Sequence, residues 1–153
     1  MITAKDLDAL LGSEITKICP IGYTDRNDNH CAHFVSHVLS YQFGFTCRGM
    51  VNGTGTAATI RVHDLFPRCR SVGAWDSRPA TLTRCLVFIT KASNIDLAAK
   101  TMVNVPRKHV GIFVDNTIWH YSNTRDQVVK QTPAEFSHHY AAPDNAMFFG
   151  EMP

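Results

Sequence analysis

A cysteine and two histidines, widely separated in the chain, are the residue types of a thiol hydrolase: Cys31, His109 and His120. Cys31 follows a polar, turn-forming stretch and precedes an apolar segment that ends near Phe43. The start of a helix presents unpaired N–H groups and the positive end of the helix dipole, which favour a thiolate over a thiol. The sequence therefore predicts Cys31 as a nucleophile at a helix N-terminus.

The two histidines flank a pair suited to a tight hairpin turn, Asp115-Asn116. If these are the two turn residues, His109 and His120 point to the same face of the hairpin as diagonal neighbours, roughly 7–8 Å apart at Cα. His109 would then take the thiol proton and return it to the leaving group. His120 would hold the far ring nitrogen of His109 and fix its tautomer.

The elements that must position these residues follow from periodicity, caps and turns. Helices are expected over 3–11, 30–43, 60–66, 94–103 and 133–140, with capping boxes at Thr3 and Thr132. Strands are expected over 85–90, 109–114, 117–122, 127–131 and 146–150. Helices that precede an antiparallel meander predict an α+β fold.

Composition limits the class of protein. A chain of 153 residues, 44% hydrophobic and 18% charged, suits one domain over 1–153. The net charge of +2 comes from scattered Lys and Arg, so no nucleic-acid partner is expected. No apolar run reaches the roughly 18–20 residues of a membrane span, and the start of the chain lacks the pattern of a Sec signal, which predicts synthesis in the cytoplasm.

The cysteines predict reduced thiols, and a metal site is the weaker alternative. Five cysteines without Cys-x-x-Cys spacing fit neither a disulfide framework nor a zinc ribbon. His33 and His37 stand one helical turn apart, with His30 and Cys31 close by, a spacing that could hold zinc. No Glu accompanies the pair, and both fall on the polar side of the helix, so we expect solvated side chains and no metal or other cofactor. His138 and His139 are likewise expected at the surface.

Three segments together resemble the NlpC-type papain-like cysteine peptidases and the related CHAP amidases, which cut amide bonds in bacterial cell-wall peptides. The segments are Cys-x-x-Phe-Val from Cys31, His-Val-Gly-Ile-Phe-Val from His109, and Ile-Trp-His ending at His120. The resemblance covers roughly residues 23–122. It implies a papain-like fold, with N-terminal helices packed on a small antiparallel sheet, and catalytic roles for these three residues. His30 replaces the family's usual Asp before the cysteine, and Ala32-His33 replaces a smaller pair, which indicates a cleft of different shape and charge.

The family's mechanism also requires an oxyanion hole. The backbone N–H of Cys31 at the helix start is the natural donor. Tyr23 occupies a place comparable to a tyrosine that lines the family's site, and either Tyr23 or Asn29 could add a side-chain donor. The sequence does not choose between them.

These observations lead to one main functional hypothesis and two alternatives. The main hypothesis is a cysteine hydrolase that cleaves an amide bond in peptidoglycan peptides. Without a Sec signal, such an enzyme would be delivered by a dedicated secretion machine as an antibacterial effector toxin, paired with an immunity protein, or released during phage lysis. The first alternative is the same apparatus acting on a cytosolic or host protein, as a protease, deamidase or transferase. The second is a non-enzymatic binding domain in which Cys31 is structural.

Overall fold

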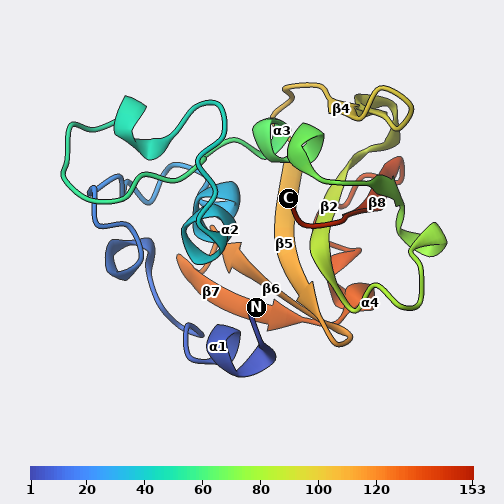
Figure 1. The fold of residues 1–153 in the computed structure, drawn as a ribbon, viewed down its shortest axis with the longest axis horizontal. Coiled ribbons are helices and arrows are strands. Elements are labelled where there is room, and N and C mark those ends of the chain that lie inside the picture. The colour runs from blue at the N-terminus through green and yellow to red at the C-terminus, as the bar shows by residue number, and fades with distance from the viewer.

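A six-stranded antiparallel sheet forms the centre of the protein, in a computed structural model that describes residues 1–153 (Figure 1). The strand order across the sheet is β1-β8-β2-β5-β6-β7, and β3 and β4 form a separate two-stranded sheet. The strands are β1 (Val72–Ala74), β2 (Arg84–Lys91), β3 (Ile95–Asp96), β4 (Thr101–Met102), β5 (Lys108–Val114), β6 (Thr117–Ser122), β7 (Gln127–Gln131) and β8 (Asn145–Gly150). Helices combined with antiparallel strands confirm the predicted α+β class.

Four short α-helices accompany the sheet. They are α1 (Ala4–Asp8), α2 (Cys31–Leu39), α3 (Val62–Leu65) and α4 (Pro133–Phe136). Helix α2 packs on β5 and β6 (Figure 1), whereas α4 packs on β6 and β7. The capping boxes predicted at Thr3 and Thr132 are both present, with Asp6 and Glu135 as the reciprocal partners. No helix has the length and apolar character needed to cross a membrane.

The sheet separates two apolar layers, because successive side chains of a strand point to opposite faces. On one face, Val110 and Ile112 of β5 pack with Phe34 of α2. On the other face, Phe113 of β5 packs with Phe136 of α4. Strand β5 is therefore buried on both sides, and its odd and even residues belong to different layers.

The hairpin between β5 and β6 has the predicted turn. Val114 pairs with Thr117, and both turn residues have positive φ, 45° at Asp115 and 68° at Asn116. Two central residues with positive φ form the type I′ turn that matches the twist of flanking strands. The paired ladder extends only to Ile112 opposite Trp119, so the first part of β5 continues without pairing to β6.

The helices predicted over 3–11, 30–43 and 133–140 end earlier in the structure, at Asp8, Leu39 and Phe136, and one predicted helix is absent. Helix α2 ends at Leu39, short of Phe43, because Ser40 adopts a left-handed conformation (φ 61°) and closes the last turn. The helix predicted over 94–103 is wrong, since this segment contains β3 and β4. Asp96 Oδ1 accepts a hydrogen bond from the Ala99 N–H at 2.9 Å, a local bond that competes with a helix.

Candidate active site

Cys31 is the first residue of α2 and lies in the layer between that helix and the sheet. Asn29 Oδ1 accepts a hydrogen bond from the Cys31 N–H at 2.9 Å, and Asn123 Oδ1 accepts one from the His30 N–H at 3.0 Å. These bonds give partners to N–H groups at the start of the helix. The Cys31 side chain is only 1% exposed. The predicted position at a helix N-terminus is confirmed, but the thiol points into the protein.

The surroundings of the Cys31 sulfur have opposing effects on the pKa of its thiol. Burial raises the pKa of the thiol to about 11, while N–H groups of Val110 and Ala32 and the charge of Lys108 act to lower it. Val110 directly follows His109, so the sulfur lies beside the part of β5 that carries the candidate base. In this conformation Cys31 is a protonated thiol at neutral pH.

His109, His120 and Gln131 form a hydrogen-bonded chain across three neighbouring strands. His109 Nε2 lies 2.8 Å from His120 Nδ1, and His120 Nε2 lies 2.7 Å from Gln131 Oε1. Gln131 pairs with Ile118, which places it on the same face as His120. The structure therefore brings the two imidazoles together on one face of the hairpin, as the turn parity predicted. We call these three residues the relay.

The relay determines where the ring protons lie. An amide oxygen only accepts hydrogen bonds, so His120 Nε2 carries a proton and His120 Nδ1 is left as an acceptor. His109 must then donate from Nε2, which leaves a lone pair on its Nδ1. That atom is buried and has no hydrogen-bond partner. Burial lowers the pKa of His109 well below its ordinary value and that of His120 to about 4, so both rings are neutral.

The cysteine and the relay approach β5 from different layers. Cys31 belongs to the same apolar layer as Val110 and Ile112, whereas His109 contacts Phe136 in the opposite layer, with ring centroids 5.6 Å apart. No hydrogen bond joins the Cys31 sulfur to His109. The structure thus brings the Cys31 sulfur to the backbone of Val110, the residue after His109, but it does not bring the Cys31 thiol and the His109 ring into a hydrogen bond.

Two residues that follow α4 cover the relay, and we call His139 and Tyr140 the cover pair. The His139 ring stacks on the His109 ring with centroids 3.8 Å apart and an interplanar angle of 9°. Tyr140 packs edge-on against His139, with ring centroids 4.6 Å apart. Burial raises the pKa of the Tyr140 hydroxyl, and a thiolate at the nearby Cys31 would raise it further. His139 is exposed, as expected, but one face of its ring shields the fully buried His109.

The two predicted oxyanion residues have other partners. The Tyr23 hydroxyl donates to Asp28 Oδ2 at 2.9 Å, and its ring packs against His30 and His33 with centroids 5.2 and 5.3 Å away. Asn29 uses its side-chain oxygen to accept the Cys31 N–H, the group expected to stabilise an oxyanion. That N–H is therefore occupied unless the Asn29 side chain turns away. The structure does not bring Tyr23 to the relay.

A metal at the relay is a weaker interpretation of the same residues. Ring nitrogens of His109, His120 and His139 all lie within 4.8 Å of one another. Two imidazole nitrogens on one tetrahedral zinc ion stand ~3.3 Å apart, whereas 2.8 Å between His109 and His120 is a hydrogen-bond length. Gln131 also holds the second nitrogen of His120, and the parallel stacking of His139 on His109 does not converge on a point. The distances favour a proton relay.

The expectation that His33 and His37 are solvated is wrong for His33, which is fully buried. Helix α2 is covered on this side by irregular segments whose positions the helical periodicity does not indicate. The two histidines lie with Cys19 and Cys47, not with Cys31 as the sequence suggested.

Sequence reasoning missed Gln131 and His139. Gln131 ends a strand that was predicted, and pairing that strand with 117–122 would have placed it beside His120. His139 could not be found in this way, because the chain after α4 has no regular structure that fixes its position.

A polar pocket of ≈ 320 Å³ adjoins the relay at His120 and Gln131. Its walls also carry side chains of both charges, Arg125, Lys130 and Glu135. A pocket with both charges suits a ligand that has carboxylate and ammonium groups.

The chemistry of these residues has to be inferred from their own geometry. Comparison with protein-family models, curated proteins and solved structures found no match for this chain.

Proposed function

We propose that this protein is a cysteine hydrolase of papain-like architecture that cleaves an amide bond, with Cys31 as nucleophile and His109 as general base. One observation carries the proposal. The relay ends at His109 Nδ1, whose lone pair has no hydrogen-bond partner. The next residue in the chain is Val110, whose N–H faces the Cys31 sulfur. A buried base without a hydrogen-bond partner is costly in a folded protein, and such groups are commonly kept for function.

In the proposed reaction, His109 Nδ1 accepts and passes on one proton in each of two half-reactions. His109 Nδ1 takes the proton from the Cys31 thiol, and the thiolate attacks the carbonyl carbon of the scissile amide. The same proton then passes to the leaving nitrogen as the C–N bond breaks, leaving a thioester on Cys31. Water, deprotonated by His109, hydrolyses the thioester and restores the thiol. His120 and Gln131 keep the His109 proton on Nε2 throughout, so that Nδ1 remains the reacting atom.

The proposal requires a more open conformation, in which the Cys31 thiol reaches His109 Nδ1 from the other layer. With Cys31 buried and its thiol pKa at about 11, little thiolate exists at neutral pH. Moving the cover pair would admit water and substrate to the relay and reduce the burial of the sulfur. Lys108, the Val110 and Ala32 N–H groups and the helix start would then act on a partly solvated thiol and lower its pKa.

The substrate class that we propose is the peptide portion of bacterial peptidoglycan. Two features support it: the resemblance of the three sequence segments to cell-wall amidases, and the pocket of mixed charge beside the relay. Wall peptides carry free carboxylates and amines, which Arg125 or Lys130 and Glu135 could pair.

A non-enzymatic binding domain is the second candidate, and one observation favours it. Cys31 is as deeply buried as Cys85, a thiol in the opposite apolar layer that has no proposed chemistry. In that case the relay would be a structural hydrogen-bond network.

The test compares the wild type with Cys31→Ala and, as a matched control, Cys85→Ala, which removes another fully buried thiol. Each protein is incubated with purified peptidoglycan, and released fragments are identified by mass. We expect fragments from the wild type and from Cys85→Ala but none from Cys31→Ala. Equal release by wild type and Cys31→Ala would exclude Cys31 as the nucleophile. If no protein releases fragments, the same three are tested on a bacterial protein extract, and absence of Cys31-dependent cleavage there favours the binding domain.

A further inference from the structure

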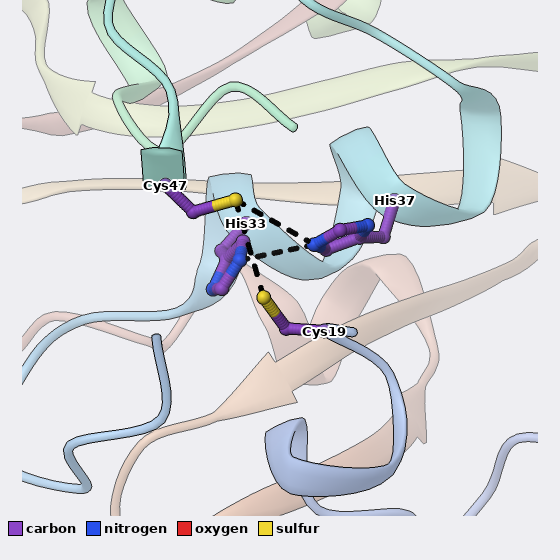
Figure 2. A group of neighbouring side chains, drawn as sticks. All are labelled: Cys19, His33, His37 and Cys47. Carbon is purple, nitrogen blue, oxygen red and sulfur yellow. Dashed lines mark hydrogen bonds between the residues drawn. The ribbon is translucent and has the colours of Figure 1, made fainter. Parts of the chain in front are cut away.

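Four side chains of the types that ligate metals converge at α2 from three separate segments: Cys19, His33, His37 and Cys47 (Figure 2). His33 and His37 lie one turn apart on α2, while Cys19 lies in the loop before that helix and Cys47 begins a short 3₁₀ helix after it. One ligand atom from each residue lies within 4.8 Å of all the others. The cluster uses none of the residues to which the proposed hydrolysis assigns a role.

Three of the six distances between these atoms are close to those of a tetrahedral zinc site. The two sulfurs are 3.9 Å apart, the two Nε2 atoms are 3.1 Å apart, and the sulfur of Cys47 lies 4.0 Å from Nε2 of His37. With Zn–S bonds of ~2.3 Å and Zn–N bonds of ~2.05 Å, a tetrahedron requires ~3.8, ~3.3 and ~3.6 Å for these pairs. Each observed distance is within ~0.4 Å of the ideal value, so small side-chain shifts would complete the site.

The positions of the ring protons on the neighbouring histidines also suit a zinc site. His30 Nε2 lies 2.7 Å from the Asp25 carbonyl oxygen and must donate to it, so His30 Nδ1 is an acceptor. His33 Nδ1 lies 3.0 Å from that acceptor and must donate in turn. This leaves His33 Nε2 without a proton and facing the cluster, with His37 Nε2 3.1 Å away. A histidine that donates its other N–H to an acceptor chain is the usual arrangement for a zinc ligand.

The two sulfurs are placed as metal-bound thiolates would be. The Ala58 N–H points at the Cys47 sulfur from 3.4 Å, a contact that stabilises negative charge on sulfur. Cys19 and Cys47 are 4% and 0% exposed, and His33 is fully buried. A disulfide would account for the two cysteines, but their sulfurs are 3.9 Å apart, beyond a bond of ~2.05 Å, and it would leave both histidines unexplained.

We propose that Cys19, His33, His37 and Cys47 bind one structural Zn²⁺ ion. Four protein ligands fill the coordination of zinc and leave no open position, which is typical of structural and not catalytic sites. The ion would fasten the segments around Cys19 and Cys47, which have little regular secondary structure, to α2, the helix that begins with Cys31. Zinc suits this donor set better than harder ions, which prefer oxygen ligands.

The first experiment measures metal content by mass spectrometry of the protein purified without chelators. We expect about one zinc per chain in the wild type and loss of it in Cys47→Ser and His37→Ala. His37→Cys replaces one zinc ligand by another and should retain the metal. Cys85→Ser removes a buried thiol outside the cluster, and His120→Asn disrupts the second histidine group; both should keep one zinc per chain.

A second measurement uses the wild type alone, so it does not depend on whether the variants fold. The wild type is unfolded with chelator and refolded with Co²⁺, and the visible spectrum is recorded. Intense absorption bands of tetrahedral cobalt with two thiolate ligands are expected, and a rise in the thermal unfolding midpoint on adding Zn²⁺ should accompany them. The proposal is overturned if the wild type contains no zinc and takes up none on refolding, if mass mapping finds a Cys19–Cys47 disulfide, or if His120→Asn, and not His37→Ala, loses the metal.

Discussion

His109 Nε2 lies 2.8 Å from His120 Nδ1, and Gln131 sets the direction of this hydrogen bond by accepting from the opposite side of His120. The reactive nitrogen of His109 is thus determined by an amide on another strand. A substitution that removes the acceptor at His120 should therefore change the tautomer of His109 while the ring stays in place. This separates an orienting role from a purely structural one.

Replacing His120 tests that orienting role. In His120→Asn the amide oxygen can still accept the His109 Nε2 proton, whereas His120→Leu leaves this buried donor unpaired, at a cost of about 1–3 kcal/mol. We expect His120→Asn to keep kcat within about 10-fold of wild type and His120→Leu to lose about 100-fold or more. Imidazole ¹⁵N shifts of His109 should report the Nε2-protonated tautomer in the wild type and in His120→Asn. Equal losses of kcat with an unchanged tautomer would contradict the role.

The buried relay predicts acid-sensitive folding. In the unfolded chain His109 and His120 take up protons below about pH 6.5, but burial holds the pKa of His120 at about 4 and that of His109 well below its ordinary value. Between these limits the unfolded state binds more protons, so stability falls as the pH falls, by up to about 1.4 kcal/mol per pH unit for each histidine. Urea unfolding at about pH 7 and about pH 5 measures the slope. It should be shallower in His120→Asn and unchanged in His138→Asn, which removes an exposed histidine.

The local part of the site could be predicted from the sequence, but its relation to α2 could not. Turn chemistry at Asp115-Asn116 fixes the hairpin, and with it the shared face of His109 and His120. Which face α2 covers depends on the alternation of β5. Since that strand is buried on both sides, apolar residues occupy both faces and the pattern gives no preference.

The cluster at α2 depends on contacts that no local pattern encodes. The spacing of His33 and His37 suggested a metal pair, but the sequence offered His30 and Cys31 as partners because they are adjacent. Irregular segments bring in Cys19 and Cys47 instead. Their paths follow from side-chain packing over long sequence separations, which helix and strand periodicity does not describe.

Tyr121→Phe should weaken the attachment of the N-terminal segment to the sheet. The buried Tyr121 hydroxyl accepts a hydrogen bond from the Ile15 N–H at 2.9 Å and donates one to Asp126 Oδ1 at 2.7 Å. Without it the Ile15 N–H is left unpaired in a residue that is 1% exposed, so we expect a loss of about 1–3 kcal/mol in unfolding free energy. Tyr41→Phe is the control, because Tyr41 is also buried but lines an open pocket, and it should change stability by less than about 0.5 kcal/mol. Equal effects from the two variants would show that the hydroxyl bonds are unimportant.

Tyr140→Ala should make Cys31 more reactive. Tyr140 lies close enough to Cys31 for a thiolate there to raise the pKa of the Tyr140 hydroxyl. Its ring also packs on the His139 ring that shields His109. Removing the phenol ring should admit water, lower the thiol pKa from about 11 and raise the thiolate fraction about 10-fold for each unit of that decrease. Iodoacetamide labelling at neutral pH with peptide mapping measures the rate at each cysteine, and buried Cys85 provides an internal reference. His138→Ala, a change at an exposed neighbour, should leave the rate at Cys31 unchanged. If Cys31 reacts no faster in Tyr140→Ala than in wild type, this residue does not control access to the thiol.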